Sequence, residues 1–167
     1  SGKFSRQQLI VIIGLSVGIL FFSYSAFSHD LFNYMFDARM VTKYGVNPYN
    51  YKALDFPLDP WIRFMHWTHR TYPYGQVWLL ITLPLSYLGF GKFVLTLFNF
   101  KLLFVLTHLG NVWLISKILE KTDKKNALLG VAFYALNPLI LIESIISPHL
   151  DSVMLFFLLA ALYFKLV

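Results

Sequence analysis

Long apolar segments alternate with a polar, aromatic-rich stretch along this chain. Residues 9–27 carry no charged side chain, and three later apolar segments of 17–20 residues occupy 102–118, 127–146 and 150–167. A transmembrane helix needs about 20 mostly apolar residues. The pattern therefore predicts an all-α integral membrane protein with about four transmembrane helices, all within a single membrane domain, 1–167.

Charged residues near the ends of these segments predict their orientation. Lys3 and Arg6 precede the first span, and a basic turn at 117–125 joins the second span to the third. Basic residues collect on the cytoplasmic side of a membrane, so four spans place both groups inside. The first segment is longer than the apolar core of a signal peptide and no A-x-A-like cleavage site follows it, so we interpret it as a retained span.

The segment 76–90 leaves two topologies open. It has 15 residues and contains Pro84, which is short for a hydrocarbon core about 30 Å thick. If it re-enters or lies at the interface, the chain crosses four times and the long loop 28–101 shares the outer face with residues 147–151. If it spans, the chain crosses five times and these two segments lie on opposite faces. We adopt four crossings.

The outer loop 28–101 is unusually aromatic in its first two thirds. Because Tyr and Trp favour the headgroup layer, we expect this loop to lie on the membrane and to carry amphipathic juxtamembrane helices. The thirteen aromatic residues of 28–78 are Phe32, Tyr34, Phe36, Tyr44, Tyr49, Tyr51, Phe56, Trp61, Phe64, Trp67, Tyr72, Tyr74 and Trp78.

The first predicted amphipathic helix covers residues 30–44. An apolar residue recurs at every fourth position, which gives one apolar stripe. Asp30 stands at the start, where its carboxylate can cap the helix, and Gly45 is placed to end it. Asp37 follows two turns after Asp30, about 10 Å along the same face. We expect both acids to point away from the apolar stripe.

A second amphipathic helix is predicted over about 60–71. Asp59-Pro60 has the pattern of an N-cap followed by proline at the first helical position. Arg63, His66 and Arg70 would then form one cationic stripe. Such a stripe suits a lipid phosphate, and it equally suits an interfacial anchor with snorkelling arginines.

Composition excludes several classes of protein. Apolar residues make up 57% and charged residues 13%, against about 45–50% and about 25% in soluble proteins. The absence of cysteine excludes disulfides, zinc thiolate sites and cysteine nucleophiles. The net charge of +6 does not indicate nucleic-acid binding, because a membrane protein facing anionic lipid has the same balance. No P-loop, dinucleotide fingerprint or serine elbow occurs.

An ordered set of short motifs carries a family resemblance. After the first span come His29-Asp30, Asp37-Ala38-Arg39, Gly45-Val46-Asn47-Pro48-Tyr49, Tyr72-Pro73-Tyr74-Gly75-Gln76-Val77-Trp78, Asn137-Pro138-Leu139 and Ser147-Pro148-His149-Leu150-Asp151. The set resembles the N-terminal part of C-type (GT-C superfamily) membrane glycosyltransferases, especially the polyprenol-phosphate-mannose-dependent mannosyltransferases. The resemblance covers most of the chain, whereas full enzymes of the superfamily have many more spans.

The resemblance implies transfer of a sugar, mannose or another hexose, from a polyprenyl-phosphate donor to an acceptor hydroxyl with inversion. It implies Asp30 as the general base, on the outward face of the cytoplasmic membrane. The acceptor would be a glycan, a lipid or a protein, and further membrane helices or a partner chain would complete the enzyme. The candidates for binding substrate and donor phosphate are Asp37, Arg39, Arg63, Arg70, Lys101, His149 and Asp151.

Each candidate also has a structural interpretation. Asp37 with Arg39 could form an ion pair, Lys101 could snorkel from the end of its span, and Asp151 could be a first-turn acid. For two further pairs inside the spans, a role in helix packing is favoured over a catalytic role. These are His108 with Asn111, as interhelical hydrogen-bond partners, and the GxxxG pair Gly14 and Gly18.

We predict no metal cofactor. His66 with His69, and His149 with Asp151, have tolerable ligand spacing, but neither pair approaches a complete site. Some members of the superfamily use a divalent cation, and the prenyl-phosphate-dependent ones commonly do not.

The competing hypothesis is a non-catalytic membrane scaffold or lipid-binding subunit. It accounts for the aromatic residues and the basic stripe without chemistry, but it gives no reason for His149 and Asp151 to share a face with Asp30. A transporter or channel fragment is disfavoured because the spans carry few charges and show no internal repeat.

Overall fold

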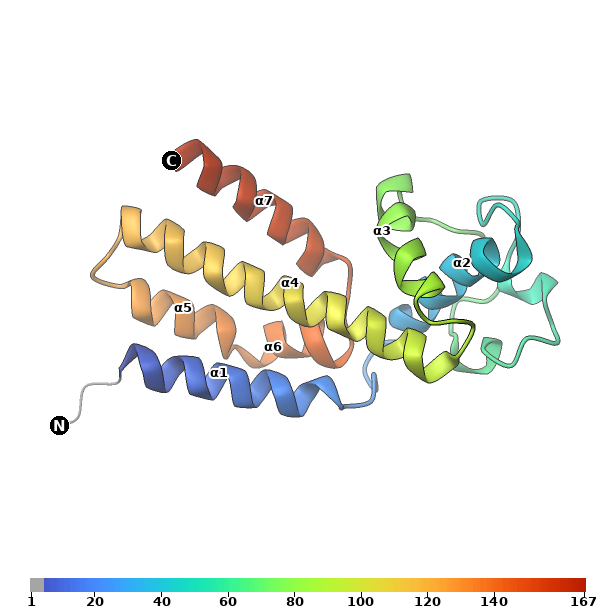
Figure 1. The fold of residues 1–167 in the computed structure, drawn as a ribbon, viewed down its shortest axis with the longest axis horizontal. Coiled ribbons are helices and arrows are strands. Elements are labelled where there is room, and N and C mark those ends of the chain that lie inside the picture. The colour runs from blue at the N-terminus through green and yellow to red at the C-terminus, as the bar shows by residue number, and fades with distance from the viewer. Residues whose placement is uncertain (1–4) are drawn as a thin grey trace. The chain divides into compact units, whose positions relative to one another are not determined.

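A computed structural model describes residues 5–167 (Figure 1). The described residues are 69% helical, and they form no strand beyond an isolated bridge between Lys52 and Thr71. The all-α prediction is confirmed. The chain divides into two compact units. Unit 1 combines the described part of Ser1–Phe27 with Leu103–Val167, and unit 2 is Ser28–Leu102.

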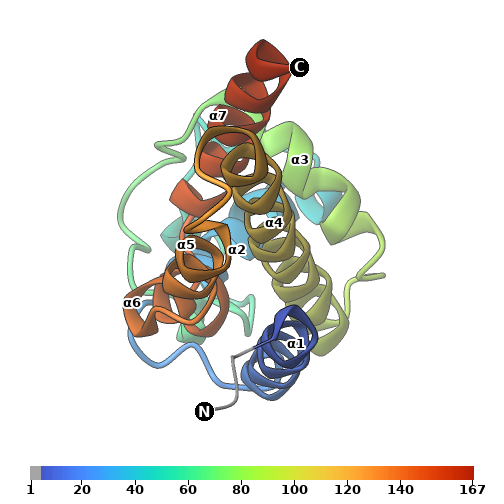
Figure 2. The same ribbon diagram turned by 90° about the vertical axis from the view of Figure 1, so that its left-hand side faces the viewer.

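Unit 1 is built from helices whose ends are encoded locally. Its elements are α1 (Arg6–Phe21), the later part of α4 (Phe93–Thr122), α5 (Ala127–Ala135), α6 (Pro138–Leu141), the π-helical turn η3 (Ile142–Ile146) and α7 (Asp151–Leu166). Ser5 and Gln8 form a capping box at the start of α1, in which each side chain accepts from the other residue's amide. Figure 2 shows α1, α4 and α5 of this unit end-on.

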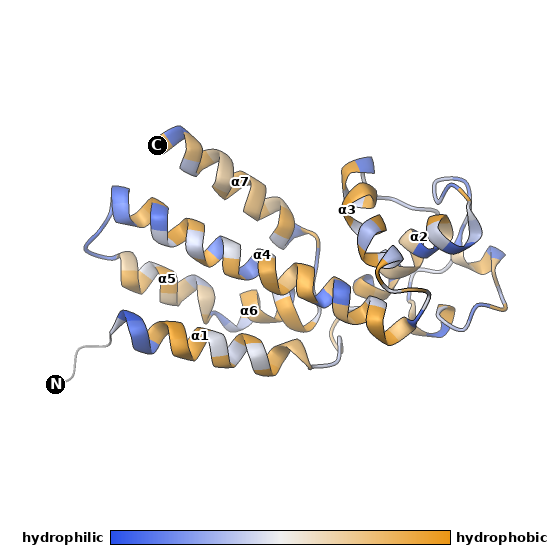
Figure 3. Ribbon diagram, in the orientation of Figure 1, coloured by the Kyte–Doolittle hydropathy of each residue, from blue (hydrophilic) through white to orange (hydrophobic). Residues whose placement is uncertain are grey.

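The core of unit 1 lies along one side of α1. Its buried members are Leu9, Ile13, Val17, Val105, Val131, Ala135 and Ile145. The opposite side of α1 is also apolar but exposed, with Ile10, Leu15 and Ile19 each at least 59% accessible (Figure 3). A helix that is apolar all round and packed on one side only is typical of contact with lipid.

Among the described residues, only α4 is both long and apolar enough to cross a membrane as one helix. The helices α5 and α6–η3 reach that length together, but the chain bends by 49° between them. The bend replaces the continuous span expected at 127–146, because Asn137 accepts from the Leu139 amide and Pro138 begins a new helix. The helix α1 is shorter, with 16 residues. Four transmembrane helices thus stay a prediction.

The ambiguous segment 76–90 contains a short helix, α3 (Gln76–Tyr87). Its 12 residues extend about 18 Å, well short of a hydrocarbon core of about 30 Å. It packs against α2 (Asp30–Tyr44) inside unit 2, where the Thr42 and Ser86 hydroxyls lie 2.9 Å apart. The length of α3 favours the topology in which this segment does not span.

The helix α2 has the bounds that the sequence predicts, and Gly45 ends it with a left-handed φ of 65°. Its predicted environment is wrong. Every residue from Leu31 to Met40 is buried, so α2 is the central helix of unit 2 and has no lipid-facing stripe. Aromatic side chains of the loop enclose it, as where Tyr34 meets Trp78 edge-on at 5.2 Å.

The second predicted amphipathic helix, 60–71, is also wrong. The chain there forms only the 3-10 turn η2 (Ile62–Phe64), while a similar turn, η1, covers Ala53–Asp55. The aromatic residues of this stretch pack inward, because Trp61 and Phe64 lie against Phe93 at 5.2 and 4.4 Å between ring centroids. The cationic stripe expected on one helical face therefore does not form.

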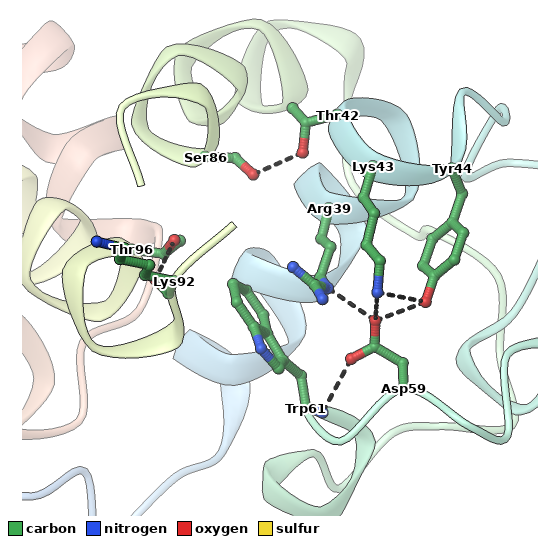
Figure 4. Close-up of polar contacts among 9 residues, drawn as sticks. All are labelled: Arg39, Thr42, Lys43, Tyr44, Asp59, Trp61, Ser86, Lys92 and Thr96. Carbon is green, nitrogen blue, oxygen red and sulfur yellow. Dashed lines mark hydrogen bonds and ion pairs between the residues drawn. The ribbon is translucent and has the colours of Figure 1, made fainter. Parts of the chain in front are cut away.

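Asp59 connects this loop to α2 (Figure 4). Its buried Oδ2 accepts from Arg39 Nε at 2.8 Å, Lys43 Nζ at 3.0 Å and the Tyr44 hydroxyl at 2.6 Å, while Oδ1 accepts from the Trp61 amide at 3.0 Å. Burial alone would raise the pKa of Asp59, but these hydrogen bonds outweigh it and hold the pKa well below its usual range. The Arg39 guanidinium also lies 3.9 Å from the centre of the Trp61 ring.

Removing Arg39 should destabilise unit 2 far more than removing Lys43. The Arg39 side chain is 7% exposed and that of Lys43 is 44% exposed, although both contact the same carboxylate oxygen. Arg39→Gln leaves a buried charge underpaired and should cost about 3–5 kcal/mol, against under about 1 kcal/mol for Lys43→Gln. Denaturant unfolding followed by tryptophan fluorescence measures both. Equal losses would show that burial does not govern this pair.

Candidate functional site

Asp30 is the first residue of α2, in unit 2. The N-cap residue is His29, so Asp30 is a first-turn acid and not the cap that its position suggested. The Asp30 amide donates to the Ser28 hydroxyl at 3.2 Å, and the residue is only partly buried. A carboxylate in the first turn is stabilised by the helix dipole and here stays accessible to solvent.

Arg70 and Tyr74 come from the loop before α3. Arg70 Nη2 donates to the Tyr74 hydroxyl at 3.3 Å, and the guanidinium lies 5.4 Å from the Trp67 ring and 5.6 Å from the Tyr74 ring. Burial raises the pKa of Tyr74, and the negative charge of Asp30 adds to the increase while Arg70 opposes it. Asp30 therefore lies within electrostatic reach of Tyr74.

Asp37 lies two turns further along α2 and is 6% exposed. Burial raises its pKa to about 7, and the positive charge of Arg70 only partly opposes this effect. Burial likewise raises the pKa of Tyr72, and the charge of Asp37 contributes. Asp30, Asp37, Arg70, Tyr72 and Tyr74 thus form one group, which we call the Arg70 cluster.

Arg70 retains donor capacity within this cluster. Its Nε is buried and has no hydrogen-bond partner among the described residues. A guanidinium presents several N–H donors in a fixed plane, which matches the geometry of a phosphate. The cluster therefore combines a partly exposed carboxylate, a carboxyl that titrates near neutrality and a cation with an unused donor.

The other candidates in unit 2 have different surroundings. Arg39 is engaged with Asp59 and not with Asp37, because residues two apart on a helix do not face each other. Arg63 is exposed and lies over the Phe64 ring at 4.9 Å. Lys101 is 2% exposed in α4 and belongs to the interior of the unit, which differs from a side chain that snorkels from a helix end.

His149 and Asp151 belong to unit 1, and His149 has a partner that the sequence did not assign. Its Nδ1 lies 2.6 Å from Oε2 of Glu143, and its amide donates to the Glu143 carbonyl at 2.9 Å. Glu143 sits in the π-helical turn η3, a conformation that is frequent at functional sites. Asp151 is exposed in the first turn of α7.

The polar residues inside α4 confirm part of the packing prediction. Asn111 donates from Nδ2 to the Tyr134 hydroxyl and to the Ser152 carbonyl, both at 3.0 Å, and so links α4 to α5 and α7. His108 is fully buried and stacks on the Tyr134 ring at 5.5 Å. These residues hold the helices of unit 1 together.

The histidines of the loop make aromatic contacts. His66 lies 5.0 Å from the Trp67 ring and 6.1 Å from the His29 ring, and His69 lies 6.0 Å from Trp67. In the part of the chain that the structure describes, no three His, Asp or Glu side chains come together in a way that could hold a metal ion.

Comparison with known proteins defines the class of protein. Residues 3–167 match the family described as alpha-(1->6)-mannopyranosyltransferase, N-terminal domain (MptA_B family), and the chain belongs to this family. It is thus part of a glycosyltransferase family, as the motifs indicated. No curated protein and no solved structure matches the chain.

The raised pKa of Asp37 predicts an unusual pH dependence of stability. The folded state holds the Asp37 proton up to about pH 7, whereas the unfolded chain releases it near pH 3.8. Raising the pH from about 4 to about 7 therefore penalises the folded state, by about 2–4 kcal/mol in total. Stability then stays level above pH 7.

Asp37→Asn removes the titrating carboxyl, so it should abolish this loss of stability with rising pH. We expect thermal unfolding of the wild type, scanned between pH 4.5 and 8, to lose stability relative to Asp37→Asn as the pH rises. Parallel pH profiles for the two proteins would mean that Asp37 ionises normally in the folded state.

Proposed function

We propose that this chain is the N-terminal module of a GT-C enzyme that moves mannose from a polyprenyl-phosphate donor to an acceptor hydroxyl. The family match over residues 3–167 carries the proposal, because it already places the chain among mannosyltransferases. The motif set of unit 2 supports the finer assignment to prenyl-phosphate donors. The acceptor is a glycan, a lipid or a protein.

Asp30 acts as the general base. It accepts the proton of the acceptor hydroxyl while the oxygen attacks the anomeric carbon from the side opposite the phosphate. The bond from that carbon to the phosphate oxygen breaks, and polyprenyl phosphate leaves with the electron pair, so the configuration inverts. The position of Asp30 in the first turn of α2 supports this role, because the residue is only partly buried and a general base must come within hydrogen-bond reach of its substrate.

Arg70 is the strongest candidate in unit 2 for the donor phosphate. The leaving phosphate needs positive charge and hydrogen-bond donors, not a proton, because it is already a weak base. Arg70 has a buried Nε with no partner among the described residues, and it lies in the same cluster as Asp30. The proposal requires no metal or other cofactor. His149, oriented by Glu143, is a second candidate for the phosphate.

The active face is proposed to lie outside the cytoplasmic membrane. Four crossings put unit 2 and residues 147–151 on the outer side, and they put the basic turn 117–125 inside. The 12-residue length of α3 supports this arrangement over five crossings.

Asp30→Asn should lower the transfer rate by about 10²–10⁴-fold, the usual contribution of a general base. The assay follows transfer from radiolabelled polyprenyl-phosphate mannose by the natural protein that contains this chain, in membranes. Asp55→Asn makes the same chemical change at an exposed acid of unit 2 whose carboxylate accepts from the Lys52 amide, so its rate should stay close to the wild type.

An unchanged rate for Asp30→Asn would contradict the assignment of the base. A folded natural protein with no transfer activity at all, in wild-type form and with any prenyl-phosphate sugar, would favour the non-catalytic scaffold instead.

Single cysteines test the orientation, since the chain contains none of its own. Leu58 of unit 2 is 96% exposed, so Leu58→Cys places a thiol where a reagent can reach it. Asp151→Cys likewise replaces an exposed residue of unit 1. An impermeant maleimide added to intact cells should label both, and it should label Lys124→Cys only after the cells are opened. Labelling of position 58 without position 151 would support five crossings and separate the two motif groups.

A further inference from the structure

A groove lies between α1, α4 and α5, entirely within unit 1. Its volume is about 630 Å³, within the range of about 300–1,000 Å³ that is usual for small-molecule sites. Leu9 and Ile13 of α1, Val112 of α4 and Leu128 of α5 are among its lining residues. None of the residues that line it belongs to the Arg70 cluster, so the groove is separate from the proposed site of transfer.

The groove changes character along its length. Charged residues line one end, Arg6 of α1 with Glu120 and Lys124, and mostly apolar residues, with Ser116 among them, line the rest as far as Gly14 and Leu109. Figure 3 shows the same change from hydrophilic to hydrophobic along α1 of unit 1. Arg6 and Gly14 are eight positions apart, which is about 12 Å of helix. One leaflet of a hydrocarbon core is about 15 Å deep, so the apolar part has the depth of a single leaflet.

The charged end of the groove carries an excess of positive charge. Glu120 is already paired, with Arg6 at 3.5 Å and with Lys117 at 3.1 Å. The basic residues at this end and in the adjoining turn are Arg6, Lys117, Lys121, Lys124 and Lys125, against Glu120 and Asp123. Clusters of this kind next to a membrane attract anionic headgroups.

Gly14, the first glycine of the GxxxG pair of α1, contributes to the open space of the groove. A methyl group built on Gly14 or on Gly18 would meet no atom within 4 Å, so neither glycine is a site of close helix packing within the described residues. Gly14 lines the groove and Gly18 does not. The missing side chain at Gly14 therefore leaves space in the apolar part of the groove.

We propose that this groove binds one anionic phospholipid of the cytoplasmic leaflet. An acyl chain occupies the apolar part beside Gly14, and the phosphate lies between Arg6 and Lys124. The apolar lining excludes a free inorganic anion as the occupant, because such an ion would gain nothing from the length of the groove. The excess of cations selects an anionic headgroup over a zwitterionic one.

Matched glycine substitutions test the proposal. The natural protein is prepared in detergent with equal amounts of phosphatidylglycerol and phosphatidylcholine, and bound lipids are counted by native mass spectrometry. The wild type should retain one phosphatidylglycerol in preference to phosphatidylcholine. Gly14→Leu, which fills the groove, should weaken retention by about tenfold or more. Gly18→Leu adds the same side chain one turn away and should retain lipid as the wild type does.

Charge and local quenching give independent readouts. Arg6→Gln with Lys124→Gln should reduce the preference for phosphatidylglycerol by about tenfold or more, since each cation near a membrane surface strengthens the attraction for an anionic headgroup. Trp113 lines the groove, so phosphatidylglycerol with brominated acyl chains should quench its emission, obtained as the difference from Trp113→Phe, in the wild type and not in Gly14→Leu.

Two results would overturn the proposal. One is equal lipid retention by Gly14→Leu and Gly18→Leu, which would mean that another helix or nothing fills the groove. The other is equal retention of phosphatidylglycerol and phosphatidylcholine by the wild type. Helix content measured by circular dichroism shows whether each variant has folded.

Discussion

The buried carboxylate of Asp59 is the interaction on which unit 2 depends. It lies 15 to 20 residues beyond its partners on α2, and it gathers two cations, a hydroxyl and a backbone amide. A loop rich in aromatic residues has no regular hydrogen-bonded ladder, so side-chain contacts take a large part in fixing its course over α2. Asp59 supplies that fixation at one end of the helix, where Arg39 and Lys43 are four residues apart and share a face.

The contacts with Asp59 occupy one polar face of α2 and leave a second polar face to other partners. Arg39 and Lys43 face the Asp59 carboxylate, while Asp30 and Asp37, seven residues apart, belong to the Arg70 cluster. The helix is thus held through cations on one side and presents acids on another. The short separation of Asp37 and Arg39 in sequence is misleading, because helical geometry directs them to different partners.

Hydrophobic periodicity predicted where α2 begins and ends but not what surrounds it. A stripe at every fourth position has the same pattern whether lipid or protein covers it, and here Phe32 and Phe36 are covered by rings of the same unit. The helix predicted over residues 60–71 is wrong for a related reason. Its helical pattern was genuine, but Asp59 is engaged with α2 and Trp61 and Phe64 pack on Phe93, so a single turn forms.

The candidate site could likewise be predicted from the sequence only in part. The sequence motifs contained Asp30, Asp37, Tyr72 and Tyr74. Arg70 was a candidate only through the cationic stripe of the predicted helix 60–71, and its grouping with these residues depends on the path of an irregular loop. Glu143 had no assigned partner because its contact with His149 requires the π-helical turn and the Ser-Pro bend that follows. No local pattern in the sequence predicts such a turn.

The two acids on the shared face of α2 occupy different environments, and this difference bears on Arg70. Two carboxylates beside one guanidinium would neutralise it if both were ionised, and Arg70 would then attract a phosphate weakly. Burial instead brings the pKa of Asp37 to about 7, whereas Asp30 stays partly exposed. Near neutral pH a large share of the Asp37 carboxyls is protonated, so less negative charge offsets the positive charge of Arg70. Environments that separate the protonation of neighbouring acids are how enzymes give them distinct roles. In the proposed mechanism, Asp30 would then accept the proton, and Asp37 would set how much negative charge lies beside Arg70, the candidate for the donor phosphate.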